Sequence, residues 1–208
     1  MHQLIAFLKQ LHDVQGLIEW GGLGLVCTIV FVETGLFMGF FLPGDSLLVT
    51  AGIFARTGHI NLGLLMLFGS ICAVAGDQLG YAIGYKTGQA LYNRPDSFFF
   101  KKKHLQRTHE FYEKYGAKTI VIARFVPIVR TFAPVVAGVG QMSYKKFVSY
   151  NVIGGLAWIN GMALTGYTLA TAFPSIGKSI EKVILVVVFL SILPAIVEFW
   201  RERRRAAA

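Results

Sequence analysis

The chain has 208 residues, of which 54% are apolar and only 15% are charged. A typical globular chain carries about 25% charged residues, so the composition excludes an ordinary soluble domain, and it also excludes intrinsic disorder. Two cysteines cannot make a disulfide scaffold. The net charge of +9 does not indicate nucleic-acid binding, because the basic residues lie between apolar segments, as in polytopic membrane proteins.

Residues 1–20 predict an amphipathic helix. Apolar residues recur there at helical spacing with polar residues between them, and no cleavable signal peptide is recognisable. The pattern fits a helix on the membrane surface, and it fits equally a helix packed on the rest of the protein. We expect a single membrane domain over 21–200 and a basic tail over 201–208. The apolar set is Leu4, Phe7, Leu8, Leu11 and Val14.

Three apolar segments reach the length of about 20 residues that a transmembrane helix needs. They are Leu62–Tyr85, Phe147–Thr171 and Val183–Trp200. The sequence therefore predicts an all-α, polytopic integral membrane protein with three full transmembrane helices.

Two further apolar segments are irregular. Gly22–Phe54 carries Glu33 and a central Pro43-Gly44-Asp45, and Ala117–Met142 carries two arginines and two prolines. Two arginines at the centre of a span cost roughly 5 to 7 kcal/mol, and prolines break a helix. We expect each segment to form a re-entrant hairpin of two half-helices, although a kinked ordinary span is the alternative. The interrupting residues of the second segment are Arg124, Pro127, Arg130 and Pro134.

The basic residues favour this topology. If Ala117–Met142 returns to the side it left, 14 of the 20 Lys and Arg residues share one side with the central loop and the C-terminus. The positive-inside rule makes that side cytoplasmic. Both irregular segments also contain a charged residue, a proline break and an apolar run ending in Ala-Gly. Two such elements entering from opposite faces would form an inverted repeat with a site where they meet.

Four ionisable residues within the irregular segments are the main site candidates. An arginine offers a planar fork of donors that fits phosphate oxygens, so Arg124 and Arg130 can converge on one phosphate. Glu33 and Asp45 can balance the arginines and exchange protons. The alternative is that these charges form salt bridges that only hold the hairpins together.

Asp77 is a secondary candidate that lies within a stripe of small residues. Gly76, Gly80 and Gly84 recur every fourth residue and predict close helix packing. Next to such a stripe, Asp77 is expected to pair with an arginine or to reach water. The sequence shows no metal-ligand spacing, no nucleophile beside a base and no phosphate-binding loop, so we expect no metal, no cofactor and no enzymatic activity.

Three motifs in order resemble the DedA family of bacterial membrane proteins, close to its namesake branch. These are Phe41 to Leu48, the Gly-Asp…Gly-Tyr…Gly stretch from Gly76, and Ala123 to Thr131. The family shares its domain with the eukaryotic VTT lipid scramblases. The resemblance implies two opposed re-entrant elements, a bacterial plasma-membrane location and functional roles for an acid pair and an arginine pair. Those pairs match Glu33, Asp45, Arg124 and Arg130.

The resemblance further implies transport of undecaprenyl phosphate to the cytoplasmic leaflet, linked to the proton-motive force and to envelope maintenance. The expected partners are a polyprenyl phosphate, other phospholipids as further candidates, and protons, with an oligomer left open. Two alternatives remain: a proton-coupled carrier for a small ion or solute, and a membrane scaffold that transports nothing. A lipid phosphatase would want a histidine at the site, and the membrane segments contain none.

Overall fold

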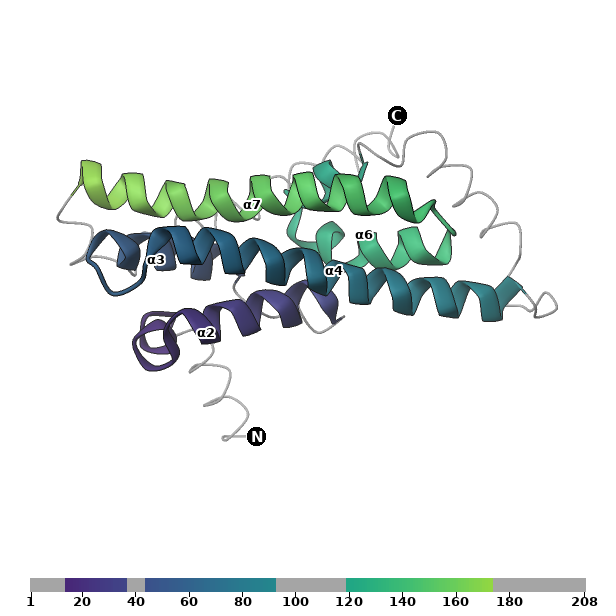
Figure 1. Ribbon diagram of the computed structural model, residues 1–208, viewed down its shortest axis with the longest axis horizontal. Coiled ribbons are helices and arrows are strands. Elements are labelled where there is room, and N and C mark those ends of the chain that lie inside the picture. Colours follow the sequence, from purple (N-terminus) through teal and green to yellow (C-terminus); the bar gives the residue numbers. More distant parts are fainter. Residues whose placement is uncertain (1–13, 37–43, 93–118, 174–208) are drawn as a thin grey trace, which may run out of the picture.

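A computed structural model of the protein describes residues 14–36, 44–92 and 119–173, and these are helical apart from short turns and a kink at Gly22. Figure 1 shows how the labelled helices of this part of the chain are arranged. The described residues contain no β-strand, as predicted for an all-α protein. The helices are α2 (Val14–Gly35), α3 (Gly44–Arg56), α4 (Leu62–Tyr92), α6 (Pro127–Val139) and α7 (Tyr144–Ala172).

Two long apolar helices form the frame of the molecule. With 31 and 29 residues, α4 and α7 are each about 45 Å long, which exceeds the roughly 30 Å of a bilayer core. They run in opposite directions, since Val74 contacts Asn151 whereas Gly69 lies against Ile159. They correspond to the spans predicted over 62–85 and 147–171. The third predicted span, 183–200, lies outside the described residues.

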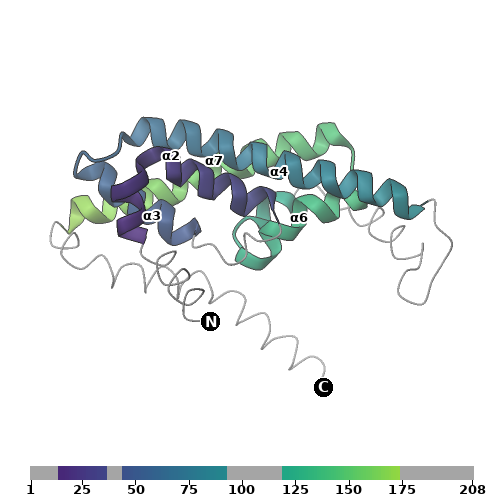
Figure 2. The same ribbon diagram turned by 90° about the horizontal axis from the view of Figure 1, so that it is seen from below.

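Two short helices lie on this frame. Both α3 and α6 have 13 residues, or about 20 Å, too short to cross a bilayer core. Contacts along the chain show that α3 follows the direction of α7 and α6 follows that of α4. Because α4 and α7 are antiparallel, α3 and α6 run in opposite directions. Figures 1 and 2 place them toward opposite ends of the frame.

Each short helix approaches its long helix through a reciprocal pair of glycines. A side chain at Gly52 of α3 would collide with the backbone of α7, and one at Gly166 of α7 would collide with the backbone of α3. The same relation joins Gly84 of α4 and Gly138 of α6. Small residues of this kind let helix backbones approach closely in membranes. We call these two contacts the α3–α7 seam and the α4–α6 seam.

The glycine stripe of α4 faces two different helices. Gly76 lies against the backbone of α2 and the side chain of Thr34, whereas Gly80 lies against Pro134 and Val135 of α6. The stripe therefore places α2, which belongs to the first irregular segment, next to α6, which belongs to the second, along one side of α4.

Both irregular segments are interrupted helices. In the first, α2 ends at Gly35 and α3 begins at Gly44. Of the predicted Pro43-Gly44-Asp45 break, Gly44 and Asp45 form the start of α3, and Pro43 lies outside the described residues. In the second, a helical segment over 119–123 gives way to a turn at 124–126, and Pro127 opens α6. Proline suits the first turn of a helix, where its missing N–H is not needed.

The prediction that both prolines break the helix is wrong for Pro134. This residue lies inside α6, which continues to Val139. Pro134 is buried against Gly80 of α4, and this packing compensates for the backbone hydrogen bond that a proline removes.

The packing is apolar both inside and outside. A large apolar cluster is formed by α2, α3, α4 and α7 and includes Leu47, Leu48, Ile53 and Trp158. A second cluster beside α6 includes Phe147. The outward side of α4 is apolar as well, as expected for a surface that meets lipid tails. Its exposed residues include Leu64, Leu67, Phe68 and Ile71.

Candidate functional site

Charged side chains gather in the interior where the interrupted helices meet. Glu33, Asp77, Arg124 and Arg130 are all buried, and Asp45 is half-buried. All four residues predicted from the irregular segments are therefore inside the molecule, together with the secondary candidate Asp77. Asp77 pairs with an arginine, which was one of its two expected roles, whereas the pairing of Glu33 and Asp45 differs from the expected one.

Arg130 links the two interrupted segments. It lies in the first turn of α6, and its Nη1 donates a hydrogen bond of 2.5 Å to Oδ1 of Asp45 at the start of α3. Its Nη2 donates to Oε1 of Glu33 near the end of α2. The guanidinium fork thus binds one carboxylate from each side of the α2–α3 break, a use for which arginine is suited.

Trp158 of α7 completes this group. Its indole N–H donates a hydrogen bond of 2.8 Å to Oδ1 of Asp45, and its ring centre lies 4.6 Å from Cζ of Arg130. A cation stacked on an indole is held by the ring quadrupole. Sequence reasoning missed Trp158. Its position offered a signal, because membrane tryptophans usually lie at the interfaces and this one lies midway along an apolar span.

Arg124 belongs to a separate cluster. It lies in the turn before α6, and its Nη2 donates to both Oδ2 of Asp77 on α4 and Oδ1 of Asn151 on α7. The Asn151 amide donates in turn to the carbonyl of Val74 at 3.2 Å. The stem of Arg124 rests against Gly154, where a Cβ would come within 3.0 Å of its Cδ. Asn151 was also missed, although an asparagine within an apolar span is a signal in itself.

The charge balance differs from the sequence expectation. Glu33 and Asp45 were expected to balance both arginines, but both carboxylates bind Arg130, and Asp77 binds Arg124. With all five groups ionised, two arginines and three carboxylates leave a net charge of −1. An excess charge in a buried setting is unfavourable unless a proton or a ligand compensates for it.

Some hydrogen-bonding capacity in the site is unused. Oε2 of Glu33 and the Nε atoms of Arg124 and Arg130 have no hydrogen-bond partner within the part of the chain that the structure describes. An unpaired buried polar group costs about 1 to 3 kcal/mol. The site therefore has an acceptor and two donors that a bound headgroup or water could satisfy.

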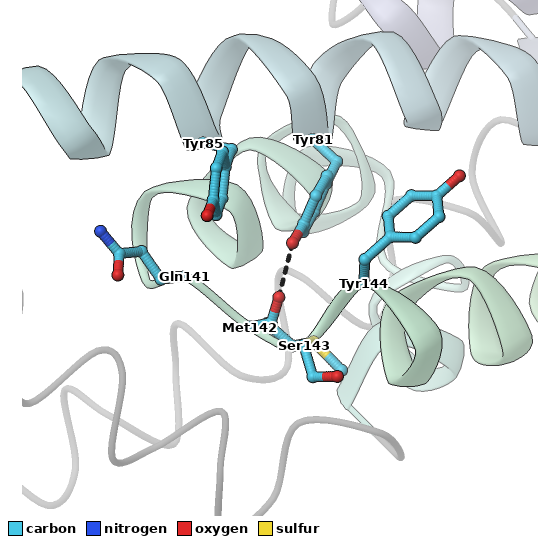
Figure 3. A pocket seen from close by; sticks show the side chains of 6 residues that line it. All are labelled: Tyr81, Tyr85, Gln141, Met142, Ser143 and Tyr144. Carbon is cyan, nitrogen blue, oxygen red and sulfur yellow. Dashed lines mark hydrogen bonds between the residues drawn. The ribbon is translucent and has the colours of Figure 1, made fainter.

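A pocket of about 390 Å³ lies away from these charges, beside the turn between α6 and α7. Its lining is aromatic and polar but uncharged. The Tyr81 hydroxyl donates a hydrogen bond of 2.5 Å to the Met142 carbonyl, as Figure 3 shows, and ties α4 to this turn. Among the described residues no group of three side chains could hold a metal ion. The pocket is lined by Tyr81, Tyr85, Gln141, Met142, Ser143 and Tyr144.

Within the described residues, α4 and α7 are long and apolar enough to cross a membrane, and a buried charge cluster lies between the helices that pack on them. The VTT domain matches residues 42–168, which hold Asp45, Asp77, both arginines and Trp158. The chain contains a VTT domain and belongs to the DedA family of membrane proteins.

Three relatives support this assignment. Protein DedA of Escherichia coli is 46% identical over 181 residues, which cover 86% of this chain and 82% of DedA. An uncharacterized membrane protein of Mycobacterium leprae is 43% identical over 176 residues, or 85% of this chain and 78% of its own length. Inner membrane protein YqjA of Escherichia coli is 31% identical over 141 residues, covering 68% and 64%. No solved structure matches the chain.

Proposed function

We propose that the protein is a lipid transporter of the bacterial plasma membrane, which moves a polyprenyl phosphate such as undecaprenyl phosphate to the cytoplasmic leaflet. The observation that carries this proposal is the buried contact between Arg130 and two carboxylates at the meeting point of two interrupted helices. A guanidinium in such a place suits a phosphate, because its fork binds two oxygens at once and it stays charged. The excess of carboxylates suits a site that also handles protons.

The architecture supports transport through the middle of the membrane. α3 and α6 are too short to cross a bilayer, run in opposite directions and lie at opposite ends of the α4–α7 frame. This arrangement fits two re-entrant hairpins that enter from opposite faces, with the C-terminus in the cytoplasm. Inverted repeats of this kind place the site near the bilayer midplane, where each hairpin can expose it to one side.

Proton coupling follows from the charge of the site. A phosphate headgroup brings about one to two negative charges into a cluster that is already at −1 when ionised. Protonation of a carboxylate compensates with the least disturbance, because the neutral acid keeps its shape. Lipid binding would then draw in a proton, and a proton gradient would bias the direction of transport.

Reconstitution into liposomes tests the proposal. We expect the protein to move a labelled polyprenyl phosphate between leaflets faster than phosphatidylglycerol, and Arg130→Gln to lose most of this activity. Arg56→Gln is the matched control, since Arg56 is an exposed arginine at the end of α3. Full transport by a variant with Gln at both 124 and 130 would overturn the proposal. Transport of inorganic phosphate alone would favour a solute carrier, and no transport a scaffold.

A further inference from the structure

The carboxylate of Glu33 lies against the first residue of α3. A Cβ added at Gly44 would collide with both oxygens and the carboxyl carbon of Glu33, so only a glycine leaves room for it. The carboxylate is thus placed at the N-terminal end of a helix, where the helix dipole attracts anions.

Only one of the two Glu33 oxygens is used. Oε1 accepts from Arg130, whereas Oε2 has no hydrogen-bond partner among the described residues. Glu33 is only 1% exposed, so solvent does not satisfy the unpaired oxygen. A carboxylate thus fills part of a place that combines an arginine fork with a helix N-terminus. A phosphate, with more oxygens in a tetrahedral array, would fill more of it.

Glu33 accepts fewer hydrogen bonds than Asp45. Asp45 accepts from Arg130 at 2.5 Å and from the Trp158 indole at 2.8 Å, whereas among the described residues Glu33 accepts from Arg130 alone. The other charged groups packed around α2 are accounted for. Asp77 of α4 binds Arg124, and α7 contributes only the neutral Trp158 and Asn151 to the two clusters.

We propose that Glu33 is an internal occupant of the anion site, and that the phosphate of a prenyl phosphate lipid displaces it from Arg130 and from the start of α3. Glu33 leaves as the neutral acid after one proton from solution has bound to its carboxylate. No covalent bond forms or breaks other than this O–H bond. The inference rests on the proposed function and adds to it a competition between two anions for one place.

Competition has a distinct signature in binding. Because the ligand must displace a charged rival, affinity falls as pH rises, by up to about tenfold per pH unit for one coupled proton. Removing the competing charge should strengthen phosphate binding, whereas removing a residue that binds the phosphate should weaken it. Glu33→Gln should bind phosphate more tightly than the wild type at high pH, and its affinity should lose this pH dependence.

The experiment uses the purified full chain in lipid nanodiscs and titrates geranyl phosphate, with geraniol as the uncharged control, from about pH 7 to about pH 9. The ligand's own second ionisation, near about pH 6, is common to all variants and cancels in their comparison. We expect the affinity of Glu33→Gln to exceed that of the wild type at least about tenfold near pH 9, as one coupled proton requires. The affinities of Asp45→Asn and Asp77→Asn should fall with pH as steeply as that of the wild type. Arg130→Gln should bind geranyl phosphate poorly.

A second measurement needs no variant. In weak buffer above about pH 7.5, the wild type should take up about one proton for each geranyl phosphate bound. The competition would be overturned if Glu33→Gln and the wild type had equal affinities with the same dependence on pH. It would also be overturned if the wild type bound geranyl phosphate without taking up a proton. Either result would leave the proposed transport standing. Failure of the wild type to bind geranyl phosphate would overturn both.

Discussion

At the scale of single residues, the site depends on space as much as on charge. Gly44 has no positive φ, so its role is not to relieve backbone strain. It is required because the Glu33 carboxylate occupies the volume that a side chain would need.

Gly44→Ala should therefore disturb the site through a single methyl group. We expect the methyl group to push Glu33 away from Arg130, to lower stability by about 1 to 3 kcal/mol and to impair transport. Thermal unfolding in detergent and transport in liposomes would measure the two effects. Gly24→Ala in α2 is the control, because no atom lies within 4 Å of its added Cβ. Equal stability of both variants would show that Glu33 can move freely.

Lysine substitutions should separate the two arginines. Arg130 uses two nitrogens to reach two carboxylates, whereas Arg124 reaches Asp77 and Asn151 from the single nitrogen Nη2. A lysine keeps the charge but loses the fork. We therefore expect Arg124→Lys to retain more transport and more stability than Arg130→Lys, measured at matched protein levels. The reverse order would show that the pairing seen in the structure does not govern function.

The candidate charges could be predicted from the sequence, but their partners could not. Glu33, Asp45, Arg124 and Arg130 are conspicuous because ionised groups in apolar segments are costly. Which carboxylate meets which arginine depends on where two interrupted helices meet in space. For this reason Asp77 was only a secondary candidate, because nothing in the sequence of α4 indicates that Arg124 will reach it.

At the scale of helices, the two seams hold the short helices in place. The stripe in α4 could be predicted because its glycines repeat every fourth residue. The glycines of the α3–α7 seam were not predicted, because Gly52 and Gly166 stand apart in sequence and become a pair only when α3 lies on α7. The continuity of α6 through Pro134 was missed because it depends on packing against α4.

Two glycines of α7 allow a matched test of the α3–α7 seam. Gly166→Ala should separate α3 from α7, because its Cβ would meet the carbonyl of Val49, and should lower stability by about 1 to 3 kcal/mol. Gly161→Ala on the same helix meets no atom within 4 Å and should leave stability nearly unchanged. Unfolding by heat, followed by circular dichroism, would compare them. A neutral result for Gly166→Ala would mean that α3 is not fixed by this contact.

At the scale of the whole molecule, two short helices that run in opposite directions lie on two antiparallel long helices. Helix lengths could be estimated from hydropathy, so the two long spans and the two short helices were expected. The charge counts predicted that the two irregular segments enter the membrane from opposite faces, and this stays a prediction. The structure shows that α3 runs parallel to α7 and α6 parallel to α4.

Cysteine labelling would test how the molecule lies in the membrane. In a background without Cys27 and Cys72, Arg56→Cys at the end of α3 should react with an impermeant thiol reagent added outside intact cells. Lys145→Cys, in the first turn of α7, should react only after permeabilisation. Both parent residues are exposed, so accessibility of the side chain itself is matched. External labelling of position 145 would contradict the re-entrant arrangement of α6.

Under the proposed lipid transport, the extra carboxylate of the site would also determine how strongly the membrane voltage opposes the movement of the lipid. A headgroup with about two negative charges that moves toward the negative cytoplasmic side is opposed by about 4.6 kcal/mol at about 100 mV. One proton that enters with it on Glu33 and leaves inside halves the charge moved, and with it the electrical work. The step would then depend on both parts of the proton-motive force, with the pH gradient driving it and the voltage opposing it. Removing the titratable acid would leave the full voltage opposing the lipid.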